Sequence, residues 1–293
     1  MEKLIGFLRL TRPANIVTAI SDILAGVAIA GYAGGTWQLH SILLLIVATV
    51  GLYGGGVVFN DVFDAALDRV ERPERPIPSG LISEKEGALL GTFLLIAGVI
   101  SAFVVSAYPS GAIAIAIAVA ALVYDKWGKH HSVLGPLNMG LCRGLNLLLG
   151  ISLLPDALSQ YGFLAVIPII YIGAITMISQ GEVHGGKSNT MLFAAFLYLI
   201  VIASILYISV GHGSYLYALI FLAILAILIY PPLIRAFRNP VGKNIGKAVK
   251  SGVLALILMN ASWAAAFDSL YLALVVALLL PVSILLARLF AVT

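Results

Sequence analysis

The segment Asn60–Asp68, with the sequence NDVFDAALD, sets the interpretation of this chain, together with Arg75–Gly80, RPIPSG, which follows it. One amide and three carboxylates appear here, directly after an apolar run long enough to cross a membrane. Continued as a helix, Asp61, Asp64 and Asp68 lie at i, i+3 and i+7 and share one face. Crowded carboxylates repel one another unless a cation neutralises them, and oxygen ligands select a hard ion. The segment therefore predicts an Mg²⁺ site.

The composition is that of an integral membrane protein. The 293 residues are 61% hydrophobic and 10% charged, with a mean hydropathy of +1.07, whereas soluble domains average about 25% charged residues. The apolar runs are long and continuous, which favours transmembrane helices over a barrel. Cys142 is the one cysteine, so an intramolecular disulfide is excluded. The net charge of +4 reflects membrane topology, and we expect no nucleic-acid partner.

Ten apolar runs predict an all-α polytopic bundle of about nine or ten transmembrane helices. The whole chain, 1–293, is expected to form a single integral membrane domain, with residues 1–13 as an amphipathic segment lying on the membrane. Because only a short break around Asp268 separates the last two runs, the number of spans stays open. The runs cover residues 14–33, 41–60, 86–107, 110–125, 134–154, 160–181, 190–210, 214–234, 249–267 and 270–289.

The placement of positive charge predicts the orientation. With the N-terminus in the cytoplasm, the segment before the first run and the loops after each even-numbered run lie inside, and they hold nearly all Lys and Arg residues. The outer turns contain neither residue type, as the positive-inside rule requires. We therefore expect a plasma membrane of bacterial type or a thylakoid, with the acidic segment facing the cytoplasm. The outer turns are those near residues 34–40, 108–109, 155–159, 211–213 and 268–269.

Basic residues beside the acidic segment suggest the ligand. Arg69, Arg72 and Arg75 could hold the oxygens of a phosphate bidentately. Carboxylates bind Mg²⁺, Mg²⁺ binds phosphate, and arginines take the remaining charge, which is what a metal-bridged diphosphate needs. The plainer alternative is a solvated, charged loop at the membrane edge.

The pattern N-D-x-x-D-x-x-x-D, formed by Asn60, Asp61, Asp64 and Asp68, resembles the first motif of the UbiA superfamily of intramembrane prenyltransferases. The RPIPSG run looks most like the chlorophyll-synthase and related branches, and Arg9–Pro13 resembles the start of the family. The resemblance covers nearly the whole chain in spacing and topology. It implies Mg²⁺ as cofactor and an isoprenyl diphosphate as substrate.

A second cluster, YDKWGKHH, follows the fourth run. At this point the family has a tyrosine followed a few residues later by a lysine, both implicated in the diphosphate site. Tyr124 matches the tyrosine and is expected to hydrogen-bond the leaving oxygens. Lys126 or Lys129 could be the lysine, although neither spacing matches cleanly. The alternative is a basic loop with an interfacial tyrosine and tryptophan.

A third cluster, SQGEVHGGK, closes the sixth run, where the family has a second acidic motif, D-x-x-x-D. Glu182 takes the first place and Gly186 the second, so one carboxylate is lost, with Gln180 and His184 as the nearby substitutes. Either Glu182 with His184 suffices, or only one metal site is complete, or prenyl transfer is lost. In this respect the chain is similar to divergent UbiA-like proteins of secondary-metabolite clusters, the Ebo-cluster kind.

Arg143 lies inside the fifth run, where a lipid-facing arginine would be costly, so it should face the interior and have a partner. Two interpretations stay open: a structural bridge to Asp22 in the first run, or a guanidinium that reaches a substrate phosphate. Asn15 and Asp22 form a polar stripe in the first run and are candidates for the acceptor side.

The predicted function is transfer of an isoprenyl group from an isoprenyl diphosphate to a lipophilic aromatic or alcohol acceptor with Mg²⁺. The alternative is a catalytically degenerate protein that binds or transports a prenyl lipid for a secondary-metabolite pathway. Expected partners are the diphosphate, the acceptor and membrane lipids. The expected site residues are, for catalysis, Asp61, Asp64, Tyr124 and Arg143; for the diphosphate, Asn60, Asp68, Arg75, Lys126, Lys129 and Lys187; for the metal, Asn60, Asp61, Asp64, Asp68 and Glu182; and for the acceptor, Asn15 and Asp22.

Overall fold

The computed structural model describes residues 2–32, 38–182 and 185–290, and in these ranges every regular element is helical. The elements are α1 (Glu2–Thr11), α2 (Pro13–Tyr32), α3 (Leu39–Phe63), α4 (Ala65–Glu71), α5 (Glu84–Val105), η1 (Ala107–Gly111), α6 (Ala112–Lys126), η2 (Gly128–His130), α7 (Leu134–Ile151), α8 (Pro155–Tyr161), η3 (Gly162–Ala165), α9 (Val166–Ser179), α10 (Ser188–Gly211), α11 (Tyr215–Arg238), α12 (Gly242–Ala266) and α13 (Leu270–Leu289).

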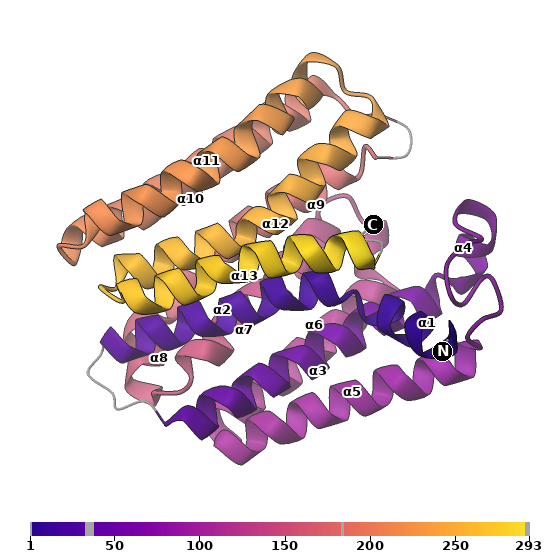
Figure 1. Cartoon of the computed structure of the whole chain (residues 1–293), viewed down its shortest axis with the longest axis horizontal. Coiled ribbons are helices and arrows are strands. Elements are labelled where there is room, and N and C mark those ends of the chain that lie inside the picture. The colour runs from indigo at the N-terminus through magenta and orange to yellow at the C-terminus, as the bar shows by residue number, and fades with distance from the viewer. Residues whose placement is uncertain (1, 33–37, 183–184, 291–293) are drawn as a thin grey trace.

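The long helices run roughly alongside one another in a bundle, shown with its length horizontal in Figure 1. Because successive long helices alternate in direction, the start of α2 and the ends of α3, α6, α9 and α13 come to the same end of the bundle. The short helices α1 and α4 lie at this end, on the right of Figure 1. The acidic segment therefore sits at one end of the bundle and not in its middle.

The predicted all-helical membrane architecture is confirmed. Within the described ranges, nine stretches of helix are long and apolar enough to span a membrane. They match nine of the ten predicted runs and leave out α7, which carries the polar residues Asn138, Arg143 and Asn146. Even so, α7 packs against α2, α6 and α9 inside the bundle. The last two runs are separate helices, α12 and α13, joined around Asp268, whose φ of 56° lies in the left-handed region.

Local sequence signals explain several helix ends. Ser83 and Glu86 form a capping box at the start of α5, in which each side chain accepts from the other residue's backbone N–H. Pro13 begins α2, where its missing N–H costs nothing. Directly before it, Arg12 has a φ of 48°, so the chain turns sharply between α1 and α2. The separate helix α1 coincides with the predicted N-terminal segment; its location on the membrane surface stays a prediction.

Small residues let the central helices approach closely. A Cβ on Gly26 of α2 would lie 2.6 Å from the backbone of α7, and one on Gly150 of α7 would lie 2.5 Å from the Ile23 carbonyl oxygen of α2. In α3, a Cβ on Gly55 would meet Leu95 at 2.8 Å and the Gly91 carbonyl oxygen of α5 at 2.9 Å. The glycine run before the acidic segment thus brings α3 and α5 together.

The helix that carries the acidic segment does not continue through it. α3 ends at Phe63, Asp64 lies at the junction with φ of −87° and ψ of 0°, and α4 begins at Ala65. The expectation that Asp61, Asp64 and Asp68 share one face of a continuous helix is therefore wrong. A break after Phe63 turns Asp64 toward a different neighbour from the one that contacts the other two carboxylates.

Candidate active site

A cavity of about 200 Å³ opens among α3, α6 and α7. Its walls are mostly apolar, and polar side chains gather at its two ends. The outer end, where α3 and α6 finish, carries Arg12, Asn60, Tyr124 and Asp125. The inner end lies about 11 residues deeper along α3, near Thr49, which at 1.5 Å per residue is roughly 16 Å. Other lining residues include Leu52, Tyr53, Gly56, Val57, Ile117, Ala121, Met139, Cys142, Arg143 and Asn146.

The carboxylates of the acidic segment are ion-paired next to the outer end of this cavity, which Arg12 and Asn60 line. Arg12 Nη2 lies 2.7 Å from Asp61 Oδ1. Arg75 Nη1 lies 2.7 Å from Asp68 Oδ2 and 3.4 Å from Asp61 Oδ1, so one guanidinium joins two carboxylates. We call Asp61, Asp64, Asp68 and their partners Arg12, Arg75 and Lys129 the mouth cluster.

The structure distinguishes between the two candidate lysines. Lys129 Nζ lies 2.5 Å from Asp64 Oδ1, and both side chains are largely buried. Lys126 is exposed and lies over the ring of Trp127, 4.7 Å from its centroid. Lys126 therefore points to the surface and makes no contact with the acidic segment among the described residues. Its role at the diphosphate stays a prediction. Lys129 belongs to the mouth cluster.

The candidate ligand atoms at the mouth fit a hard divalent cation. Asn60, Asp61, Asp64, Asp68 and Glu182 offer only oxygen ligands, the type that Mg²⁺ prefers. In the described parts of the chain, however, no three Asp, Glu, His or Cys side chains gather as a ready metal site. Each carboxylate of the acidic segment is instead held by a cationic side chain. Cations on movable side chains occupy the oxygens that a metal ion would share.

Asn60 lies beside these ion pairs and makes a contact of another kind. Its Nδ2 donates to Asp125 Oδ1 on α6 at 3.0 Å. Asp125 is 4% exposed and lines the cavity, as does the neighbouring Tyr124. The predicted position of Tyr124 at the diphosphate end of the cavity is therefore compatible with its place in the fold.

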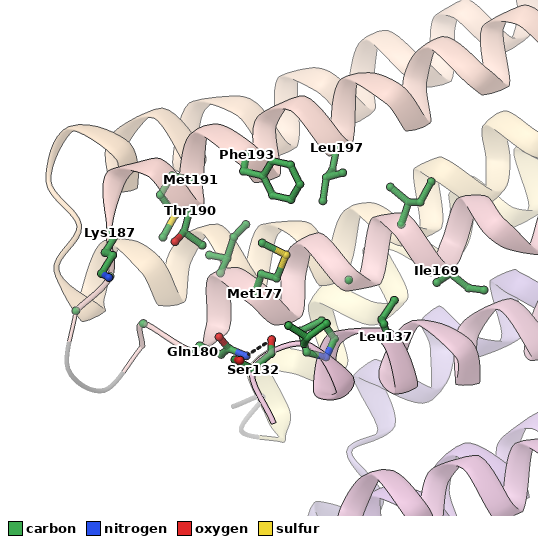
Figure 2. Close-up of a pocket in the computed structure, with 18 residues that line it drawn as sticks. Ser132, Leu137, Ile169, Met177, Gln180, Lys187, Thr190, Met191, Phe193 and Leu197 are labelled. Atoms are coloured by element: carbon green, nitrogen blue, oxygen red, sulfur yellow. Dashed lines mark hydrogen bonds between the residues drawn. The ribbon is translucent and has the colours of Figure 1, made fainter. Parts of the chain in front are cut away.

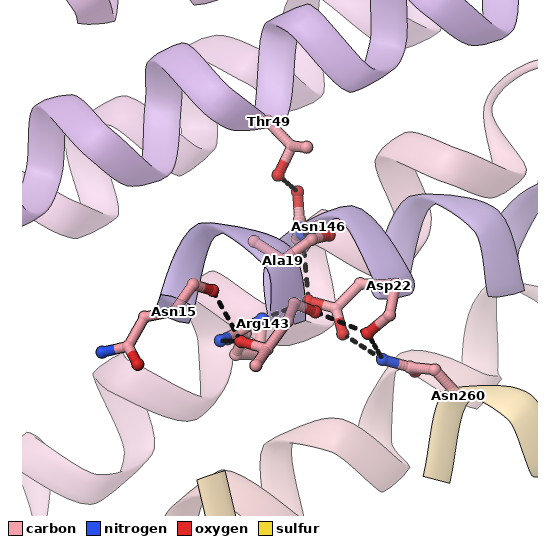
Figure 3. A network of polar contacts seen from close by, with 9 residues as sticks. Asn15, Ala19, Asp22, Thr49, Arg143, Asn146 and Asn260 are labelled. Carbon is pink, nitrogen blue, oxygen red and sulfur yellow. Dashed lines mark hydrogen bonds and ion pairs between the residues drawn. The ribbon is translucent and has the colours of Figure 1, made fainter. Parts of the chain in front are cut away.

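The inner end of the cavity meets a buried hydrogen-bond network, drawn in Figure 3. Arg143 Nη1 donates to Asp22 Oδ2 at 2.8 Å, and Asn260 Nδ2 donates to Asp22 Oδ1 at 2.6 Å. Asn146 donates to Asp22 Oδ2 at 2.9 Å, and Thr49 donates to Asn146 Oδ1 at 2.8 Å. The network of these five residues, called the deep network below, joins α2, α3, α7 and α12.

This network bears on three predicted site residues. Of the two interpretations of Arg143, the structure forms the bridge to Asp22; the guanidinium also lies 4.9 Å from the ring centroid of Tyr53, at the cavity wall. Asp22 is 1% exposed and its oxygens accept three side-chain donors, which places it in the core; its assignment to the acceptor side stays a prediction. The Asn15 side chain points away from the network in Figure 3, although its backbone carbonyl oxygen accepts from Thr18 Oγ1 at 2.7 Å, and Asn15 is not among the residues that line the cavity.

The second acidic motif lies after α9. Glu182 is half-buried, and burial raises the pKa of its carboxyl while the nearby charge of Arg72 lowers it in part. Arg72 follows α4, so charges from the two motifs influence each other. Gln180 is tied elsewhere, because its Nε2 donates to the Ser132 carbonyl oxygen at 3.2 Å. The other proposed substitute, His184, lies outside the described residues.

Lys187 belongs to a different surface feature. It lies at one end of a groove of about 680 Å³ between α7, α9 and α10, shown in Figure 2. Apolar side chains such as Leu137, Ile169 and Leu197 line the rest of the groove. In the described part of the chain, Lys187 makes no contact with the mouth cluster. Its role in binding the diphosphate therefore stays a prediction.

Two residues at the cavity had no role assigned from the sequence. In the sequence, Arg12 is part of the segment Arg9–Pro13 that resembles the start of the family, and Asp125 is the neighbour of Tyr124. The positive φ of Arg12 is costly for a residue with a Cβ, of order 1–3 kcal/mol, and such strain concentrates at functional sites. In this backbone conformation the Arg12 guanidinium forms its ion pair with Asp61.

Comparison with known proteins identifies the family. Residues 19–249, well over half of the chain, match the profile of the UbiA prenyltransferase family. The chain belongs to the UbiA prenyltransferase family. The intact first motif of this UbiA protein contributes the three carboxylates of the mouth cluster, and its second motif, which lacks one carboxylate, follows α9.

Relatives and solved structures agree with this assignment. A digeranylgeranylglyceryl phosphate synthase of Methanosarcina barkeri is 34% identical over 131 residues, 45% of each chain. The matched stretches span between about a third and a half of the length of the first curated relatives. A solved digeranylgeranylglyceryl phosphate synthase has a TM-score of 0.66 at 23% identity, covering 92% of this chain and all of that one. A UbiA homologue from Archaeoglobus fulgidus bound to DMAPP and Mg²⁺ has a TM-score of 0.60 at 17% identity, with 85% and 98% covered. At these identities the structures establish the shared fold.

Proposed function

We propose that this protein is an intramembrane prenyltransferase that moves an isoprenyl group from an isoprenyl diphosphate to a lipophilic acceptor with Mg²⁺. One observation carries the proposal: carboxylates paired with arginine and lysine stand at the polar mouth of an apolar cavity between transmembrane helices. Such a site holds a charged diphosphate at the bundle end and shields a hydrocarbon chain from water. The Archaeoglobus fulgidus relative, whose structure holds DMAPP and Mg²⁺, supports the same ligand class.

The cationic side chains have a role that follows from their pairing. Arg12, Arg75 and Lys129 neutralise carboxylates in this structure and could bind phosphate oxygens once those carboxylates bind metal. Asn60, Asp61, Asp64, Asp68 and Glu182 would hold Mg²⁺, which when bound stabilises negative charge on the leaving diphosphate. Exchange of partners keeps every charge at the mouth neutralised.

The reaction then proceeds within the cavity. The bond between C1 of the isoprenyl group and the diphosphate oxygen breaks, and its electron pair leaves with the diphosphate. The acceptor's nucleophilic atom forms a new bond to C1 and releases its proton. Arg12, Arg75 and Lys129 stabilise the departing charge, and Tyr124 hydrogen-bonds the leaving oxygens. Leu52, Val57, Ile117 and Met139 exclude water from the carbocation-like centre.

The proposed orientation places the mouth cluster on the cytoplasmic side. Basic residues concentrate in the segments at this end of the bundle, and the turns expected on the opposite side contain no Lys or Arg. A water-soluble diphosphate from the cytoplasm would then reach the site directly. Labelling of single cysteines placed in Arg75–Gly80, with an impermeant reagent on intact cells and on inverted vesicles, tests the orientation.

Turnover tests the function. The purified full chain in detergent is mixed with Mg²⁺, labelled isoprenyl diphosphates of several chain lengths, and a panel of phenolic, quinone-precursor, alcohol and phosphorylated glycerol-ether acceptors. We expect transfer of label and release of diphosphate, both abolished by EDTA. Asp156→Asn serves as a matched control, because Asp156 is exposed on α8 at the opposite end of the bundle. Metal-dependent diphosphate binding without turnover for any pair would instead identify a binding or transport protein, the alternative that the loss of a carboxylate at Gly186 favours.

A further inference from the structure

Among the four buried aspartates of the described chain, Asp125 stands apart. Asp22, Asp61 and Asp68 each form an ion pair with an arginine. Asp125 is 4% exposed, and no lysine or arginine nitrogen comes within ion-pair distance of it in the described residues. Its one hydrogen bond there is accepted from the Asn60 amide at 3.0 Å. A carboxylate kept at a cavity without a cation partner calls for a specific role.

The chemistry of this contact fixes the orientation of Asn60. In the structure Asn60 presents its NH₂ group to Asp125 Oδ1, and this carboxylate oxygen accepts the hydrogen bond. The carbonyl oxygen Oδ1 of Asn60 is then turned to another direction, and it accepts no hydrogen bond in the described structure. Oδ1 is also the one atom of this side chain that can bind Mg²⁺. An amide free to rotate would spend part of its time with the nitrogen, which cannot bind the metal, in that position.

The segment that contains Asp125 holds a second residue of the first motif. Lys129, four residues later, pairs with Asp64. The end of α6 and the turn after it therefore contact Asn60 and Asp64 at the same time. This support comes from outside both acidic motifs, in a chain whose second motif lacks one carboxylate at Gly186.

We propose that Asp125 is a positioning residue that holds the Asn60 amide with its carbonyl oxygen available to the divalent cation. The inference rests on the proposed function, because it assigns Asn60 to the Mg²⁺ of the prenyl-transfer site. Partners of metal ligands that fix ligand orientation are worth about tenfold to a hundredfold in metal affinity. We expect an effect of this size when Asp125 loses its ability to act as an acceptor only.

A swap of the two side chains tests the proposal. Binding of Mn²⁺ to the purified full chain is measured by electron paramagnetic resonance without substrate. Asp125→Asn should weaken binding about tenfold or more, because two amides can pair either way round and can hide the Asn60 oxygen. Asn60→Asp should also weaken it, because two carboxylates then face each other. The double variant Asn60→Asp/Asp125→Asn restores one donor and one acceptor, so it should recover most of the lost affinity.

The Mn²⁺ affinities of these variants separate a positioning role of Asp125 from a merely structural one. Asp156→Asn, a surface substitution far from the mouth, should bind Mn²⁺ like the wild type. A folded Asp125→Asn with wild-type affinity, or a folded double variant no better than the single ones, overturns the proposal. If Asp125→Asn does not fold, the double variant alone decides, since it keeps the hydrogen bond. Wild-type protein that binds Mn²⁺ but transfers no prenyl group contradicts the proposed function and leaves the role of Asp125 standing. Wild-type protein that does not bind Mn²⁺ overturns the role of Asp125, and the proposed function is then decided by the turnover experiment alone.

Discussion

The mouth cluster and the deep network both contain aspartate paired with arginine, yet they are built for different purposes. In the deep network, Asp22 is 1% exposed, and three side chains from α7 and α12 donate to its two oxygens. In the mouth cluster, Lys129 and Asp64 keep 13% and 19% of their side chains exposed and rest on a single contact. Complete hydrogen bonding fixes the first arrangement, whereas in the proposed function the second exchanges partners when metal and diphosphate bind.

The comparison shows how one chain separates stability from reactivity. A buried ion pair whose remaining donors and acceptors are filled resists rearrangement, because breaking it leaves an uncompensated charge in an apolar surrounding. Ion pairs near water lose less, since solvent replaces the missing partner. We therefore expect substitutions in the deep network to affect folding first and those in the mouth cluster to affect turnover first.

The largest effect is expected from the deep network. Asp22→Ala leaves the Arg143 guanidinium without its carboxylate in the core, which should lower the free energy of unfolding by about 3–5 kcal/mol. Unfolding in mixed detergent micelles measures this loss. A variant without both charges, Asp22→Leu/Arg143→Met, should be less damaged than Asp22→Ala. Equal stability of Asp22→Ala and the wild type would show that the pair is not a core element.

The second effect is on the reaction. Asp64→Ala should reduce prenyl transfer about 100- to 1,000-fold, as loss of a group that stabilises transition-state charge does. Its effect on unfolding should be smaller than that of Asp22→Ala, because the pair with Lys129 rests on one contact and is more exposed than the pair of Asp22 and Arg143. Initial rates at saturating diphosphate, measured beside a melting curve, test both statements. Full activity of Asp64→Ala would contradict the assignment of the first motif.

A smaller effect concerns pH. Burial raises the pKa of Glu182 in the folded protein, so the folded state binds this proton more tightly than the unfolded chain does. Stability without ligand should therefore fall as pH rises from the ordinary glutamate pKa through the raised one. Glu182→Gln should remove this part of the pH dependence. Unfolding measured over a pH series for the two proteins is the test, and identical pH profiles would contradict a raised pKa.

The smallest effect is expected at the shortened second motif. Gly186→Asp restores the missing carboxylate, and its Cβ would lie 3.0 Å from Ile245 Cδ1 and 3.2 Å from Met191 Cε, both flexible side-chain ends. Gly186→Ala introduces the same Cβ without charge and is the matched control. We expect Gly186→Asp to bind Mg²⁺-diphosphate more tightly than Gly186→Ala by about 1 kcal/mol or less, measured by calorimetry. Equal affinities would show that position 186 does not reach the ligand.

Part of the site could be predicted because it is local in the chain. The spacing of Asn60, Asp61, Asp64 and Asp68 can be read directly from the sequence. Their oxygen atoms predict a preference for a hard cation. The break after Phe63 could not be read from this spacing, since helix propensity does not locate a turn that tertiary contacts stabilise. Because the sequence does not reveal this break, it predicts one continuous helical face.

Other features depended on residues distant in the sequence. The choice of Lys129 over Lys126, and the contact between Asn60 and Asp125, depend on how the end of α6 meets the end of α3. Arg12 reaches Asp61 across 49 positions because the chain turns with a positive φ before Pro13. None of these distances is encoded in composition or periodicity.

The sequence by itself determined that this is a polytopic helical membrane protein with an oxygen-rich cation site at a helix end. Hydropathy over about 20 residues and the spacing of acidic side chains are local properties of the sequence. Neither depends on how the helices pack. Only the tertiary structure decided which cation neutralises which carboxylate, and that Asp22 pairs with Arg143 in the core. Ion pairs and hydrogen bonds act over a few ångströms in space, so partners far apart in the chain become known only once the helices are packed.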